Sequence, residues 1–267
     1  MSLLTFIKID LKYFKSIQSL SMATSSSKKN QQPVDIISGR VLLGLIGLLA
    51  FLLPIFLFFV SIIIDDCNEI QSSISAHYHT GARDAMVGII CALSFAFFAY
   101  KGYGDDKSVL NDSLFGTMAA IFALGVAFFP TSVDANESST CVPVFDNRIY
   151  GHVHYVSAVL LFFTLAYFCI FQFTKVDSST YCFSKWDSLT KKKKSVNRFY
   201  IACGAIILFC IALAGLYFLI DEENSIKKSI MPYKPIFWLE TVMLWAFAAG
   251  WLRKSKFFGV YSNQELE

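Results

Sequence analysis

The sequence predicts an all-α protein, a polytopic membrane bundle of six transmembrane helices with both chain ends in the cytoplasm. The apolar residues fall in six long blocks, and no block alternates with the period of two that marks a transmembrane β strand. Only 16% of the residues are charged, against about 25% in soluble domains, and the mean hydropathy is +0.53. These observations exclude a disordered chain, a disulfide-rich miniprotein and a soluble nucleic-acid-binding protein.

Residues 1–40 form a polar, basic leader that is expected to be cytoplasmic. Within it, the low-complexity stretch 23–33 (ATSSSKKNQQP) is predicted to be disordered. Two interpretations of residues 3–20 stand: an interfacial amphipathic helix, or an extension upstream of a true start at Met22. A cleavable signal peptide is not expected, because the first apolar block is too long and lies too far from the start.

The predicted transmembrane domain covers residues 41–255, and residues 256–267 form a short cytoplasmic tail. Its apolar blocks are 41–64, 85–100, 114–129, 153–173, 200–220 and 236–252. A membrane-spanning helix needs about 20 residues, so the second, third and sixth blocks are expected to include polar residues from their ends. Pro54 predicts a kink in the first helix. Small residues such as Gly88, Gly116 and Gly204 predict close helix packing.

The lysines and arginines give the orientation. With the start of the chain in the cytoplasm, the cytoplasmic segments hold 18 of the 23 lysines and arginines. The expected location is the cell or inner membrane. The run from Lys191 to Lys194 either only anchors this topology or also binds anionic lipid head groups. Cys67 and Cys141 fall in the outer segments, where they form a disulfide or remain two free thiols.

All four histidines gather on one side of the predicted bundle. His77, His79, His152 and His154 each lie just before an apolar block that starts from the outer face. Because the orientation was derived from lysine and arginine alone, this clustering is an independent observation. It allows three interpretations: ordinary interfacial side chains beside tyrosines, a metal site, or a proton relay or pH sensor.

The metal interpretation depends on helical spacing. If the second helix continues upstream, His77 and Asp84 share a face with Ser73, and His154 points inward from the fourth helix. Neutral imidazole and carboxylate are suitable ligands for Zn²⁺, with His79 or His152 as alternates. Three such ligands around an open position would activate a bound water near neutral pH.

Glu240 is an ionisable residue inside the sixth block, five residues past Pro235 and therefore about 7 Å below the outer surface. A group at this depth usually faces the bundle interior and has a partner or a function. Glu240 is therefore a candidate general base, metal ligand or proton carrier. The alternative is a protonated glutamate that hydrogen-bonds to a neighbouring helix.

The run 75–103 (SAHYHTGARDAMVGIICALSFAFFAYKGY), followed by 125–131 (GVAFFPT), resembles a family of uncharacterised six-helix membrane proteins found mostly in bacteria. This resemblance covers about residues 40–255 and implies the fold but no activity. The chain is more weakly similar to the alkaline ceramidase and adiponectin receptor (CREST) superfamily of zinc-dependent membrane hydrolases. The pairs Ser73/His77 and Ser75/His79 match its Ser-x-x-x-His element, with Asp84 as the acid. The chain lacks that family's late His-x-x-x-His pair and has six blocks instead of seven.

These features lead to one expected function and two alternatives. The expectation is a metal-dependent hydrolase that acts on a lipid or amide at the outer face, with zinc held by histidines and Asp84. Glu240 and Ser73 would be its catalytic residues. The first alternative is a proton-coupled carrier, channel or sensor that uses Glu240 and the histidines. The second is a structural membrane protein. The expected partners are the lipid bilayer and a lipid substrate, and no nucleic acid.

Overall fold

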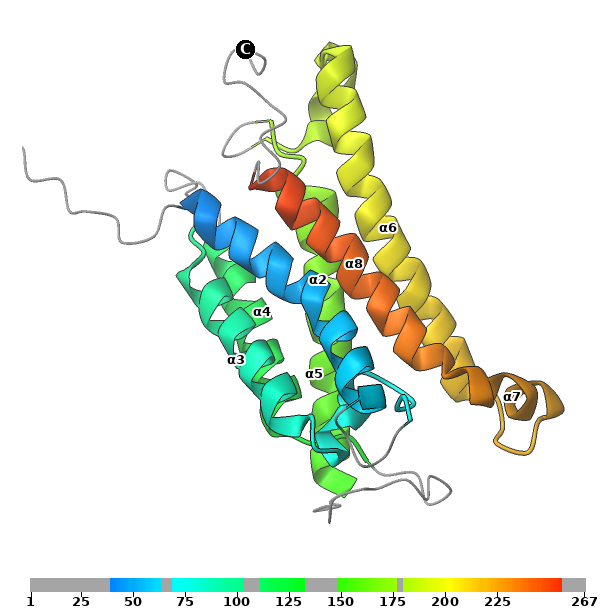
Figure 1. Ribbon diagram of the computed structural model, residues 1–267. Helices are drawn as coiled ribbons and strands as arrows, with labels where there is room; N and C mark the ends of the chain where they lie inside the picture. Colours follow the sequence, from blue (N-terminus) through cyan, green and yellow to red (C-terminus); the bar gives the residue numbers. More distant parts are fainter. Residues whose placement is uncertain (1–38, 64–68, 103–110, 133–147, 177–179, 256–267) are drawn as a thin grey trace, which may run out of the picture. The chain divides into compact units, whose positions relative to one another are not determined.

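The structure is a computed structural model that describes residues 39–63, 69–102, 111–132, 148–176 and 180–255. The described residues form helices and connecting turns and include no strand, so the predicted all-α class is confirmed for them. The leader, Cys67, Cys141 and the tail after residue 255 lie outside the described residues. The long helices are α2 (Gly39–Ile63), α3 (Arg83–Ala99), α4 (Asp112–Phe128), α5 (Arg148–Tyr167), α6 (Lys191–Leu219) and α8 (Pro235–Lys254) (Figure 1).

Short helical segments join these long helices. They are η2 (Ser75–His79), η3 (Phe168–Gln172), η4 (Cys182–Ser188), α7 (Ser225–Ile230) and η5 (Met231–Tyr233). The segment η3 is one π-helical turn that continues α5, so the predicted fourth block runs through both elements. Each of the six predicted apolar blocks lies almost wholly within one long helix, with η3 completing the fourth.

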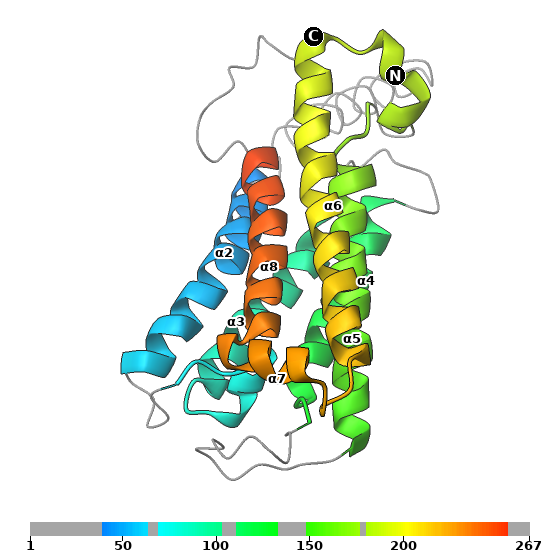
Figure 2. The same cartoon turned by 90° about the vertical axis from the view of Figure 1, so that its right-hand side faces the viewer.

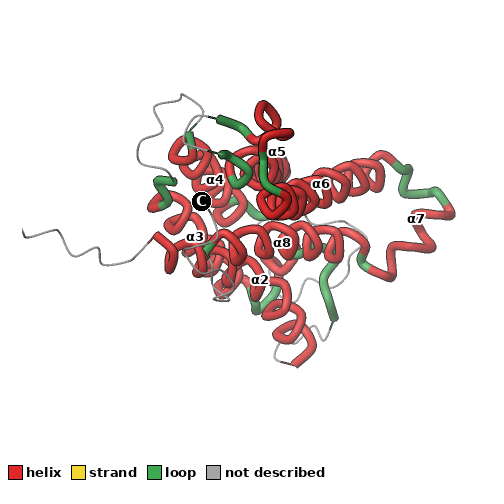
Figure 3. The backbone as a smooth tube through the Cα atoms, turned by 90° about the horizontal axis from the view of Figure 1, so that it is seen from above, coloured by secondary structure: helices red, strands yellow, loops and turns green. Residues whose placement is uncertain are grey.

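The long helices of the described residues pack in chain order as a closed ring. Each helix contacts its neighbours in the sequence, and α8 returns to pack against α2 (Figures 1 and 2). The view along the bundle in Figure 3 shows α8 between α2 and α6. Consecutive helices run in opposite directions, so α3, α5 and α8 begin at one end, called the histidine end. Helices α2, α4 and α6 begin at the other, called the lysine end.

Local sequence signals set the starts of these helices. The Asn111 side chain accepts a hydrogen bond from the Leu114 N–H at 2.9 Å and caps α4. Thr190 does the same for α6 through the Lys193 N–H at 3.2 Å. Helix α8 begins at Pro235, whose missing N–H costs nothing in the first turn.

Close packing at small residues is confirmed at Gly116 and Gly204 and is wrong at Gly88. A Cβ added at Gly116 would lie 2.9 Å from the Phe97 carbonyl oxygen, and one at Gly204 would lie 3.0 Å from the Ala166 carbonyl oxygen. Both glycines therefore let neighbouring backbones approach. Gly88 is exposed and an added Cβ there would meet no atom within 4 Å, because α3 buries its opposite face.

An aromatic cluster fills the centre of the bundle toward the lysine end. The Trp251 ring is fully buried and lies 5.0 Å from Tyr100, 5.3 Å from Phe173 and 5.5 Å from Phe168, centroid to centroid. The Tyr100, Phe168 and Phe173 contacts are edge-on, which is a favoured aromatic geometry. The cluster holds α3, the end of α5 and α8 together.

The described helices have the length and surface of membrane helices. By length and composition four of them can cross a membrane: α2, α5 with η3 (Arg148–Gln172), α6 and α8. Helices α3 and α4 have 17 residues each, about 26 Å in length. Large apolar side chains face outward all round, including Phe95 (68% exposed), Ile121, Val156 and Leu219. Soluble proteins rarely expose so much apolar surface, so this is the surface of a membrane protein.

Candidate functional site

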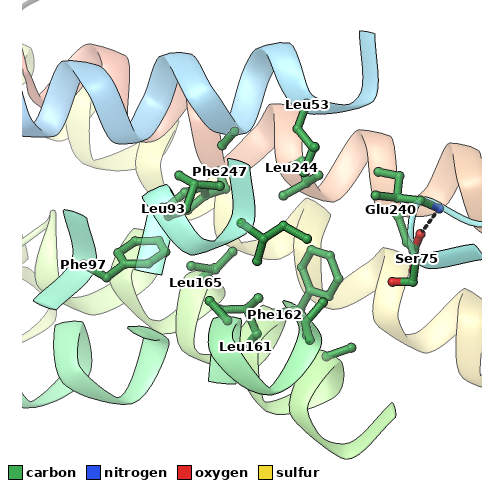
Figure 4. Close-up of a pocket in the computed structure, with 16 residues that line it drawn as sticks. Leu53, Ser75, Leu93, Phe97, Leu161, Phe162, Leu165, Glu240, Leu244 and Phe247 are labelled. Carbon is green, nitrogen blue, oxygen red and sulfur yellow. Dashed lines mark hydrogen bonds between the residues drawn. The ribbon is translucent and has the colours of Figure 1, made fainter. Parts of the chain in front are cut away.

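A cavity of about 60 Å³ lies inside the ring of helices. A single water molecule needs a cavity volume of roughly 10–15 Å³, so this cavity is larger than a site for one water. Side chains from α2, α3, α4, α5 and α8 line it, together with the residues at the start of η2. Its wall is built from apolar groups that include Leu53, Leu93, Phe162, Leu165, Leu244 and Phe247 (Figure 4).

Glu240 is the one ionisable residue among the described residues that line this cavity, and Ser75 is the other polar one. Figure 4 shows both at one end of the cavity, with Phe97 at the other. Glu240 lies in the second turn of α8, is half-buried and lines the cavity. The predicted inward orientation of Glu240 is therefore correct.

The backbone before η2 holds this carboxyl group. The Ile74 N–H donates a hydrogen bond of 2.6 Å to Glu240 Oε2, marked in Figure 4, and the Ser75 backbone also hydrogen-bonds to it. In return, the Phe237 N–H donates to the Ser72 carbonyl oxygen at 3.0 Å. Backbone N–H groups aimed at a carboxyl group make strong hydrogen bonds when it is ionised. Together these contacts clamp the segment 72–75 onto the first turns of α8.

His77 is fully buried beside this clamp. Its Nδ1 lies 3.0 Å from the Ser73 carbonyl oxygen and 3.1 Å from that of Ile74, and its ring packs 5.9 Å from the Phe237 ring. A carbonyl oxygen only accepts, so Nδ1 carries the proton. The Ser73 hydroxyl accepts from the Ala76 N–H at 2.9 Å and so stabilises the start of η2.

His79 and His154 are both buried against the segment that follows α4. His79 Nε2 donates to the Thr131 carbonyl oxygen at 2.8 Å, and His154 Nδ1 donates to the Phe129 carbonyl oxygen at 2.7 Å. The structure therefore brings together two of the predicted site histidines, and they hold the end of α4 to the starts of α3 and α5.

Asp84 and His152 do not join this group. The Asp84 side chain is 91% exposed and pairs with Arg83 at 3.2 Å, while His152 is exposed and bonds to the Arg148 carbonyl oxygen one turn earlier. The expectation that His77 and Asp84 share one helix face is wrong, because the extended backbone of Thr80 separates η2 from α3. The Thr80 hydroxyl donates to the His77 carbonyl oxygen and accepts from the Ala82 N–H, which stabilises this break.

The described residues do not assemble a metal centre. Among them, no group of three or more histidine, cysteine, aspartate or glutamate side chains lies close enough to hold a metal ion. Within the described part of the chain, His77, His79, Asp84, His152 and His154 therefore do not form one cluster of possible metal ligands. Zinc stays a prediction.

A second buried polar cluster, at the lysine end, was missed by the sequence analysis. Lys175 Nζ lies 3.7 Å from Asp112 Oδ1, and the Tyr100 hydroxyl donates to Asp112 Oδ2 at 3.0 Å. Both charged side chains are almost fully buried. The available signal was that Asp112 and Lys175 each lie two residues outside an apolar block, but their pairing depends on how α3, α4 and η3 meet in space.

No protein-family model matches the chain, and comparison with curated proteins and with solved structures gives no significant match.

Proposed function

We propose that this protein is a multi-pass membrane carrier or sensor that binds one small amphipathic molecule in its central cavity, with Glu240 receiving the polar head. The observation that carries the proposal is the cavity itself, an apolar space with a single carboxyl group at one end. Such a space matches an apolar tail that ends in a hydrogen-bond donor, namely an amine, an amide or a hydroxyl.

The energetics favour this class of ligand. Each CH₂ group moved from water into an apolar wall contributes about 0.8 kcal/mol. A carboxyl group in apolar surroundings is costly unless it is paired. Glu240 accepts the backbone N–H groups of Ile74 and Ser75, and two carboxylate oxygens have about four acceptor sites. Glu240 therefore keeps capacity for the donor group of a ligand, and a ligand with a carboxylate head is disfavoured.

The proposal includes six membrane spans with both chain ends on the cytoplasmic side of the cell or inner membrane. Helices α3 and α4 complete the ring and carry exposed apolar side chains such as Phe95, Ile121 and Phe128. An even number of spans puts both ends on one side, and the bias of lysine and arginine assigns that side to the cytoplasm.

The test is binding of a short-chain primary alkylamine to the purified protein in detergent, measured by isothermal titration calorimetry. We expect saturable binding that weakens at least tenfold in Glu240→Gln, while the carboxylic acid of the same chain length does not compete. Glu223→Gln, a change at an exposed acid outside the cavity, is the matched control and should bind as the wild type does. Equal binding by wild type and Glu240→Gln, or no binding by either, would refute the proposal.

A metal-dependent hydrolase remains the second candidate, for one specific reason. His77, His79 and His154 are buried, and each donates one ring N–H to a backbone carbonyl oxygen. This same arrangement orients histidines that bind metals. Elemental analysis decides the matter: stoichiometric zinc in the wild type that is lost in His154→Ala supports the hydrolase, and its absence from the wild type removes it.

A further inference from the structure

The first turns of α6 and the short helix before it form a strongly basic surface at the lysine end, here called the basic cap (residues 182–198). It contains six cations, Lys185, Lys191, Lys192, Lys193, Lys194 and Arg198, and one acid, Asp187. Lys185, Lys191, Lys192 and Arg198 are exposed. Residues 191 and 198 are seven apart and therefore share a face of the helix.

The length of α6 places these charges at the level of the lipid head groups. With 29 residues the helix is about 44 Å long, whereas the hydrocarbon core of a bilayer is about 30 Å thick. Its apolar part follows Arg198, so the excess length is the lysine-rich start. Figures 1 and 2 show this start of α6 extending past the ends of α2 and α8.

An apolar side chain lies within the same surface. Phe183 of η4 is 51% exposed and is two residues from Lys185. An exposed aromatic residue among cations is typical of segments that lie in the interface of an anionic membrane, where the ring enters the lipid and the cations meet phosphates. A soluble acidic partner would satisfy the charges but would gain little from this ring.

The start of α6 adds a further reason for an anion. Its first turn contains four lysines and no acid. Cations at this end of a helix lie against the positive end of the helix dipole, which is unfavourable. A phosphate group at this position would offset both the dipole and the repulsion among the lysines.

We propose that the basic cap binds the head group of an anionic phospholipid of the membrane in which the chain lies. This inference is independent of the cavity and of Glu240, because the basic cap shares no residue with the cavity lining. Binding stabilises the position of η4 against the head groups, and it makes the protein sensitive to the anionic lipid content of its membrane.

The experiment is native mass spectrometry of the full chain in detergent, titrated with dioctanoyl phosphatidylserine or dioctanoyl phosphatidylcholine. Each cation near an anionic surface strengthens binding by a factor of about five, so K185Q/K191Q/K192Q/R198Q should bind phosphatidylserine at least tenfold more weakly. The control R83Q/K228Q changes two exposed cations at the histidine end and should bind as the wild type does. Thermal unfolding of all three proteins should coincide, since the changed side chains are exposed.

Wild-type preference for phosphatidylserine, lost in the quadruple variant and kept in the control, supports the proposal. It is overturned if the wild type binds both lipids equally, if the control loses as much affinity as the quadruple variant, or if poly-glutamate displaces phosphatidylserine and binds more tightly. The last result would assign the surface to an acidic protein partner.

Discussion

Replacing Lys175 by methionine is expected to destabilise the protein strongly, although its ion pair with Asp112 is long. At 3.7 Å and an effective dielectric constant of about 20, the attraction is about 4.5 kcal/mol. Both side chains are almost fully buried, so the variant leaves the charge of Asp112 without its buried cation. Breaking a buried pair in this way costs about 3–5 kcal/mol. At about 2–4 °C per kcal/mol for a chain of this size, the midpoint of thermal unfolding should fall by roughly 6–20 °C.

The matched control is Lys228→Met. Lys228 lies only 2.6 Å from Glu223, but the two side chains are 55% and 85% exposed, so solvent screens the pair and its loss should cost less than about 1 kcal/mol. Thermal unfolding in detergent, followed by tryptophan fluorescence, measures both variants. D112N/K175M should recover most of the loss, since neither charge is then stranded. The reasoning is refuted if Lys175→Met is no worse than Lys228→Met, or if the double variant loses the sum of the single changes.

Three further changes have defined outcomes by the same measurement. Gly116→Ala should cost about 1–3 kcal/mol because the new methyl group meets a backbone oxygen, whereas Gly88→Ala should stay within about 0.5 kcal/mol; similar losses in both would contradict the packing argument. His154→Phe should cost about 1–3 kcal/mol by leaving the carbonyl group that follows α4 without its donor, and His152→Ala should cost almost nothing, since its ring is exposed. Asn111→Ala should cost about 1 kcal/mol through the lost cap of α4, and an unchanged midpoint would show that the cap contributes nothing.

The helices were predictable because their signal is local. A run of apolar residues long enough to cross a bilayer specifies a helix by its own composition, and each of the six blocks lies in a helix. The caps at Asn111 and Thr190 are likewise local, since each side chain bonds to a backbone N–H three residues later. Apolar residues lie on every face of these helices, so the sequence gives less information on which face points into the bundle. For that reason Gly88 was wrongly placed in a helix–helix interface.

The sequence predicts which residues gather at the histidine end but not how they are arranged there. Sequence position alone brought the four histidines to one side, but it did not show that Thr80 interrupts the helix, which turns Asp84 to the outside. The partners of the buried rings are backbone carbonyl groups at Phe129 and Thr131, and a backbone group has no signature in the sequence.

The proposed ligand binding at Glu240 predicts coupling to the segment 72–79, because the same carboxyl group would have both roles. Its oxygens accept the backbone of Ile74 and Ser75, and a ligand head that approaches from the cavity competes for, or adds to, those hydrogen bonds. Glu240→Ala removes the acceptor entirely, so amide hydrogen exchange in 72–79 should accelerate; Glu240→Gln, whose side-chain oxygen still accepts, should give an intermediate rate. Exchange at the start of α4 serves as the internal control and should not change. If the segment 72–79 exchanges at the wild-type rate in Glu240→Ala, the hydrogen bonds to Glu240 do not stabilise this segment. The only role left for Glu240 is then in the cavity.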